Sequence, residues 1–114
     1  MIAVIFEVVP FVGERHRYFD LAGDLRAHLE ATDGFLSVER FESLSIRGKL
    51  LSLSFWRDEE AVRRGRETEE HRAAQIAGRG GVFAAYRLRV AEVLRDYGLE
   101  DRSEAPEDSR ARHG

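Results

Sequence analysis

The segment that most constrains the fold of this chain is residues 2–9, IAVIFEVV, which is apolar at both odd and even positions apart from Glu7. Successive side chains of a β-strand point to opposite faces of its sheet. A strand with this pattern must therefore be covered on both faces, as in the middle of a sheet. Pro10 and Gly13 follow and end the strand.

The spacing of apolar residues predicts a helix and then a second strand after residues 2–9. Apolar residues at helical spacing predict a helix over residues 14–31, closed by Gly34. Residues 35–45 form a second predicted strand, in which a shift of apolar parity between Val38 and Phe41 suggests a bulge.

Residues 49–75 contain an apolar strand that runs almost directly into a charged helix. Residues 49–56 alternate as a strand and pair with the previous one through a tight turn at residues 47–48. Asp58 is a good N-cap, and two glutamates lie in the first turn of a helix predicted over residues 59–74.

The C-terminal part contains one further strand and a polar arm. Residues 82–94 alternate as a long fourth strand, although residues 91–94 also fit a helix. We expect one domain over residues 1–97 and a polar C-terminal arm over residues 98–114. The arm has the composition of a disordered extension, and we expect it to lie against the body or a partner subunit.

This order predicts an α+β fold, the ferredoxin-like βαββαβ arrangement with a four-stranded antiparallel sheet. Two helices cover only one face of such a sheet. Because residues 2–9 need cover on both faces, we expect a second copy of the chain on the other face. The predicted assembly is a homodimer with its sheets face to face.

The composition of the chain limits the classes of binding partner and of functional site that it can have. The net charge of −3 over 114 residues does not favour nucleic acid or an acidic membrane. The chain has no cysteine, which excludes disulfides, thiol nucleophiles and zinc–thiolate sites. Residues 1–9 are too short to span a bilayer and lack the basic start of a signal peptide, so we expect a cytoplasmic protein.

Four segments of the sequence carry a family resemblance: FLSVERFESL, GKLLSLSFWRDEEAV, EEHRAAQ and YRLRVAEVLRDYG. Together they resemble the antibiotic biosynthesis monooxygenase (ABM) family of dimeric α/β barrels. The resemblance implies a homodimer with one small-molecule cleft per subunit, between the sheet and its helices. It implies a cofactor-independent monooxygenase acting on a small aromatic or polyketide-like compound. The alternatives on this fold are a non-catalytic small-molecule-binding or stress-response dimer, or an isomerase.

The haem-degrading branch of these folds is disfavoured. That branch has an asparagine, a tryptophan and a histidine where this chain has Glu7, Gly65 and Gln75. Without the axial histidine the iron lacks a good ligand at that place. We expect no cofactor, and no spacing of histidines and carboxylates predicts a metal site.

Two residues are candidate catalytic bases. His71 titrates near neutrality and is expected at the cleft end of the second helix, or else it serves only to satisfy that helix end. Glu7 lies in an apolar strand, where burial is expected to raise its pKa toward that of a general base. The alternative for Glu7 is an ion pair with Arg87 or Arg89.

Three further residues are candidates for substrate binding. Trp56 would floor an aromatic pocket or else belong to the core. Tyr86 would donate a hydrogen bond to a substrate oxygen or simply pack with its hydroxyl in water. Gly65, costly in mid-helix, would leave room for a ligand or for a neighbouring ring.

Overall fold

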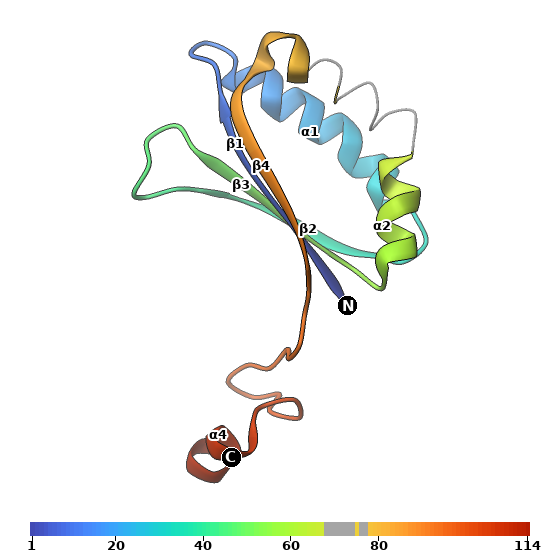
Figure 1. Ribbon diagram of the computed structural model, residues 1–114, viewed down its shortest axis with the longest axis vertical. Coiled ribbons are helices and arrows are strands. Elements are labelled where there is room, and N and C mark those ends of the chain that lie inside the picture. The colour runs from blue at the N-terminus through green and yellow to red at the C-terminus, as the bar shows by residue number, and fades with distance from the viewer. Residues whose placement is uncertain (68–74, 76–77) are drawn as a thin grey trace.

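A computed structural model describes residues 1–67, 75 and 78–114. Its strands form one four-stranded antiparallel sheet in the order β2-β3-β1-β4 (Figure 1). The strands are β1 (Ile2–Pro10), β2 (Phe35–Glu42), β3 (Leu50–Trp56) and β4 (Phe83–Glu92). The helical elements are α1 (Arg15–Glu30), α2 (Glu59–Arg66), the short η1 (Gly78–Val82) and α4 (Glu107–His113). The predicted ferredoxin-like α+β fold is confirmed.

Strand β1 lies inside the sheet, as its two-sided apolar pattern predicts. It pairs with β3 from Ile2 opposite Trp56 to Val8 opposite Leu50, and it pairs with β4 on its other side. The even-numbered side chains of β1 face α1 and α2, because they belong to the clusters that those helices cover. The odd-numbered side chains face the other way.

The core between sheet and helices has two parts. Under α1, Tyr18 and Ala22 pack on Val8 and Leu50, together with Val82. Under α2, Ala61 packs on Ile2 and Trp56. Helix α1 therefore covers the sheet near Val8 and Leu50, and α2 covers it near Ile2 and Trp56.

The opposite face of the sheet carries no helix in the described part of the chain (Figure 1). Cross-strand register places Ile5, Leu53 and Phe55 on this face. Phe41 of β2 joins them, since it lies opposite Leu51. We call this surface the open face.

The predicted bulge in the second strand is misplaced. The register shift lies between Phe35 and Ser37, not between Val38 and Phe41. Val38 points toward the helices and Phe41 toward the open face. The change of apolar parity reflects a sheet with apolar residues on both faces, and needs no bulge to explain it.

The arm has a structure of its own and stands apart from the body (Figure 1). Arg102 donates to the carbonyls of Gly98 and Gly114 and to Ser109 Oγ, and its guanidinium lies 5.1 Å from the centre of the Tyr97 ring. The side chain of one arginine thus holds the arm folded, which its polar composition did not predict.

One prediction concerns the α2–sheet contact. A Cβ added at Gly65 would lie 2.6 Å from Trp56 Cη2, too close for either group to remain in place. We expect Gly65→Ala to lower the free energy of unfolding by about 1–3 kcal/mol, as overpacking of a core does. Urea unfolding followed by circular dichroism measures this.

Gly23→Ala in α1 is the matched control, because a Cβ there meets no atom within 4 Å. It should raise stability by roughly 0.5–1 kcal/mol through helix propensity alone. Equal effects of the two substitutions would contradict the close contact of Gly65 with Trp56.

Candidate functional site

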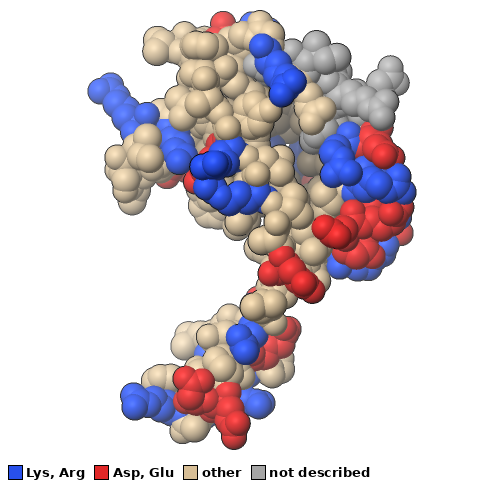
Figure 2. All heavy atoms as spheres, in the orientation of Figure 1, with Lys and Arg blue, Asp and Glu red and all other residues tan. Residues whose placement is uncertain are grey.

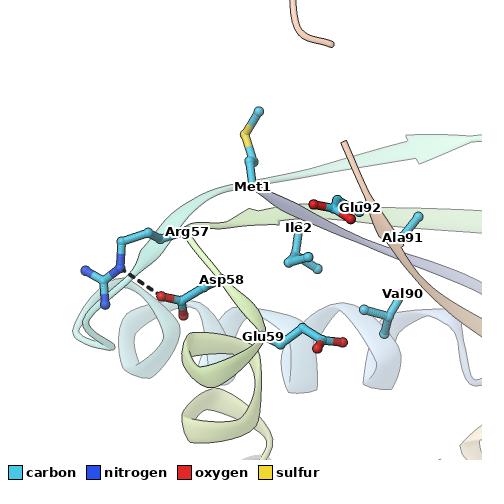
Figure 3. Close-up of a pocket in the computed structure, with 8 residues that line it drawn as sticks. All are labelled: Met1, Ile2, Arg57, Asp58, Glu59, Val90, Ala91 and Glu92. Carbon is cyan, nitrogen blue, oxygen red and sulfur yellow. Dashed lines mark hydrogen bonds and ion pairs between the residues drawn. The ribbon is translucent and has the colours of Figure 1, made fainter. Parts of the chain in front are cut away.

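A groove runs between α2 and β4. It consists of two adjoining hollows of about 380 and 320 Å³, which share Glu59 and Val90. Figure 3 shows the side chains of Ile2 and Val90 pointing toward Glu59 in the first hollow, whereas Met1 points away from it. Both hollows are open to solvent, and charged as well as apolar side chains line them.

An apolar stripe follows β4 beside the groove and meets the two hollows at Val90. Tyr86, Leu88 and Val90 alternate along the strand and lie opposite Val8, Phe6 and Val4, so they face the helix side of the sheet. Their exposed fractions are 48%, 50% and 45%, because β4 is the edge strand and the described helices cover it only in part. We call these three residues the β4 stripe. It spans about 13 Å at the rise of a β-strand.

The rim of the groove on α2 is charged but internally matched. Arg63 makes ion pairs with Glu60 and, at 2.9 Å, with Glu67, and Arg64 lies 3.6 Å from Glu60. Figure 2 shows these mixed charges gathered over α2. Hydrogen bonds from Arg63 hold the pKa of Glu60 below its ordinary value, so this carboxyl stays ionised.

The start of α2 is fixed at the groove by a cap. Asp58 Oδ1 accepts a hydrogen bond of 2.8 Å from the Ala61 backbone N–H, which confirms the predicted N-cap. This bond is the main reason that the pKa of Asp58 is lowered. Arg57, between β3 and α2, donates to both carboxylate oxygens of Asp33, at 3.2 and 3.1 Å. These hydrogen bonds connect the start of α2 to the loop before β2.

Trp56 and Gly65 lie beneath the groove in the core, and neither lines the hollows. The Trp56 side chain is 4% exposed, its Nε1 donates to Ser54 Oγ at 2.9 Å, and its ring meets Phe35 edge-on at 5.2 Å. The space left by the missing side chain of Gly65 is filled by the Trp56 ring. Of the two interpretations drawn from the sequence, core packing describes both residues.

Tyr86 is at the far end of the β4 stripe from Val90. Its ring lies 5.8 Å from Phe6 and 6.2 Å from Phe83, and its hydroxyl accepts from Arg79 Nη2 at 3.5 Å. The ring is packed on one side while the hydroxyl keeps access to solvent. This position is compatible with both alternatives given for Tyr86, donation to a substrate oxygen and simple packing with the hydroxyl in water.

Glu7 lies on the open face, away from the groove. It accepts a hydrogen bond of 2.9 Å from Arg89 and is 3.4 Å from Lys49 Nζ. The expected rise in its pKa is wrong: the hydrogen bond from Arg89 lowers the pKa and outweighs desolvation. The alternative ion pair with Arg89 is the one the structure contains. Burial failed as a guide because two cations reach this carboxylate.

His71 lies outside the described residues, so its role as a base stays a prediction. Val90, Leu88 and Arg79 were missed as site residues. The alternation within residues 82–94 contained the signal for the first two, since they share the parity of Tyr86. Nothing in the glycine-rich stretch around Arg79 pointed to a neighbouring tyrosine hydroxyl.

Within the described part of the chain, no helix is long and apolar enough to cross a membrane. Among the same residues, no three histidines or carboxylates are grouped so that they could hold a metal ion.

The chain is similar in sequence to proteins that are already known. The family model "Antibiotic biosynthesis monooxygenase" matches residues 1–77. The chain is 47% identical over 93 residues to a protein of Pyricularia oryzae named jasmonate monooxygenase ABM, covering 82% of this chain and 43% of that protein. It is 37% identical over 62 residues to the uncharacterized protein YqjZ of Bacillus subtilis, covering 54% of this chain and 53% of that one. The chain thus spans about half the length of these curated relatives.

The fold is also similar to that of Rv0793 from Mycobacterium tuberculosis. The TM-score is 0.76 at 20% identity, covering 85% of this chain and 98% of that one. At this identity the likeness concerns the fold alone.

The cap at the groove leads to a pH-dependent prediction. The pKa of Asp58 is lower in the folded chain than in the unfolded chain, so the ionised cap stabilises the fold above the ordinary aspartate pKa of about 3.9. That stability is lost as the pH falls through the lower, folded-state pKa. We expect Asp58→Ala to lower the Tm at pH 7 and the difference from wild type to shrink toward about pH 2.5. Thermal melts across this range measure it.

Asp58→Asn is the control, since asparagine caps a helix without a titrating group. It should keep more of the Tm at pH 7 than Asp58→Ala does. A difference between wild type and Asp58→Ala that stays constant with pH would contradict the charged cap.

Proposed function

The chain belongs to the antibiotic biosynthesis monooxygenase family, and on this premise we propose that it is a cofactor-independent monooxygenase of a small, largely apolar molecule. The observation that carries the proposal is the groove between α2 and β4, with its half-exposed β4 stripe. Apolar side chains beside charged ones suit a small molecule that has an apolar body and a few polar groups.

The proposed reaction begins with a carbon acid. A base removes a proton from a CH₂ group activated by a neighbouring carbonyl or aromatic ring, and the carbanion transfers one electron to dioxygen. Recombination forms a C–O bond and, after protonation, a hydroperoxide. Loss of the second carbon-bound proton and cleavage of the O–O bond leave a carbonyl and one water. Each CH₂ thus consumes one O₂ and gives one C=O and one H₂O. The protein supplies the base, donors for the developing anion and a site of low polarity.

The assignment of residues follows from their positions. We keep His71 as the proposed base, from its place in the sequence and because a histidine side chain ordinarily titrates near neutrality. Glu7 is the weaker candidate, because it is ion-paired on the open face with a lowered pKa. Val90 and Leu88 contact the apolar part of the substrate, and Tyr86 donates to its oxygen. The relative named a jasmonate monooxygenase supports oxygenation of a small molecule by a related chain.

Filling the groove should stop the reaction. We expect Val90→Trp to lower kcat/KM for anthrone, a simple carbon acid, by at least tenfold, because the indole would occupy both hollows that Val90 lines. Oxygen uptake and anthraquinone formation, at one O₂ per anthrone, measure the rate against the uncatalysed oxidation. His71→Ala should abolish turnover with the circular dichroism spectrum unchanged.

Leu94→Trp, at a side chain 81% exposed beyond the end of β4, is the control and should keep wild-type activity. Saturable binding of anthrone by the wild type without oxygen uptake would overturn the oxygenase in favour of a binding protein. Conversion of a substrate without oxygen would favour the isomerase.

We further propose that two copies pair through their open faces. The face carries Ile5, Leu53 and Phe55, and its buried-strand carboxylate Glu7 is already neutralised by Arg89 and Lys49. Pairing within the subunit lowers the cost of taking the Glu7 carboxylate out of water, and Arg87, which lies opposite Glu7 on the same face, would meet the partner subunit. The arm of residues 98–114 is then free to reach the partner.

A charge on this face should separate the subunits. We expect wild type to sediment as a dimer at micromolar concentration and Leu53→Asp to raise the dissociation constant about a hundredfold or more, because an unpaired carboxylate would be buried. Leu36→Asp is the control, since Leu36 lies at the β2 irregularity and is 54% exposed. A monomeric wild type in ultracentrifugation would contradict the pairing.

A further inference from the structure

Arg79 lies beside the Tyr86 end of the β4 stripe, away from the charged helix α2. On α2, Arg63 and Arg64 are paired with glutamates, whereas Arg66, which lines the second hollow, makes no ion pair among the described residues. Arg79 makes no ion pair with any carboxylate among the residues that the structure describes, and its one contact there is the 3.5 Å hydrogen bond to the Tyr86 hydroxyl. A bond of this length holds the guanidinium near the phenol and leaves most of its five N–H donors available.

The surroundings of this pair are apolar and open. Phe6, Phe83 and Tyr86 form an aromatic cluster with ring centres 5.8–6.2 Å apart. Arg79 is exposed, and a Cβ at the neighbouring Gly80 or Gly81 would meet no atom within 4 Å. A cation beside an apolar surface strengthens its interaction with an anion, because the aromatic side excludes water.

We infer that Arg79 and the Tyr86 hydroxyl form a subsite for one anionic oxygen group, which makes the ligand of the groove an apolar molecule with a single acidic end. The inference rests on the proposed function, because it assigns the orientation of the substrate in that groove. A carboxylate or enolate oxygen accepts from the Arg79 guanidinium and from the Tyr86 hydroxyl. The apolar body of the ligand extends along Leu88 toward Val90, about 13 Å away along the strand.

The arrangement has a consequence for selectivity. Arginine remains protonated at all ordinary pH values, so the subsite favours an anion over a neutral analogue of the same shape. A hydrogen bond to a charged group is worth about 1.5–3 kcal/mol. Loss of Arg79 should therefore weaken the binding of the anion about tenfold to a hundredfold and leave the affinity for the neutral analogue nearly unchanged.

The experiment compares two fluorescent probes with the same rings: 8-anilinonaphthalene-1-sulfonate, an anion, and N-phenyl-1-naphthylamine, which is neutral. We expect wild type to bind the anion more tightly and Arg79→Gln to lose that preference, with the neutral probe changed less than about twofold. Tyr86→Phe should cause a smaller loss for the anion, and Arg79→Lys should retain part of the preference. Val90→Trp should weaken both probes, which localises them to the groove.

Arg87→Gln is the matched control. It removes the same charge from the strand position next to Tyr86 and should leave both affinities unchanged, provided that ultracentrifugation shows the same oligomeric state as wild type, because Arg87 lies on the open face opposite Glu7. The inference is overturned if Arg79→Gln and Arg87→Gln weaken the anion equally, if Arg79→Gln weakens both probes equally, or if wild type binds neither probe. Failure of the oxygenase proposal is separate: the charge preference would persist in a protein that consumes no oxygen with anthrone.

Discussion

The structure depends on β1 being apolar on both faces. With neighbours on each side, this strand supplies even-numbered side chains to the two core clusters under α1 and α2 and odd-numbered side chains to the open face. A single layer of helices therefore leaves part of its apolar surface uncovered. The proposed pairing of two copies is the consequence of that imbalance, and the ion pairs of Glu7 neutralise one of the charges on this face.

The groove is a second consequence of the same sheet. Strand β4 lies at the edge of the described sheet, next to β1, and the described helices cover it only in part. Its helix-facing side chains Tyr86, Leu88 and Val90 stay half exposed. The Trp56–Gly65 contact fixes how closely α2 approaches β3, and the Asp58 cap fixes where α2 begins. Together they leave the space between α2 and β4.

Features that depend on a few neighbouring residues could be predicted from the sequence, whereas the positions of the candidate site residues relative to the groove could not. The strand parity of residues 50–56 and the Asp58 cap follow from rules that act over a few residues, and the structure contains both. Trp56 was ambiguous because an aromatic strand end suits a core or a pocket equally well. Glu7 misled because its pKa depends on Arg89, which is 82 positions away along the chain. Such long-range contacts leave no periodic signal.

The sequence by itself determined the order of the elements, the central place of β1 and the need for cover on both faces of the sheet. These follow from side-chain period and from the cost of leaving apolar surface in water. Only the tertiary structure decided that Trp56 fills the space at Gly65, that Glu7 faces away from the groove, and that Arg79 meets the Tyr86 hydroxyl. Each depends on which segments distant in the chain lie side by side, and that is settled by packing, not by local preference.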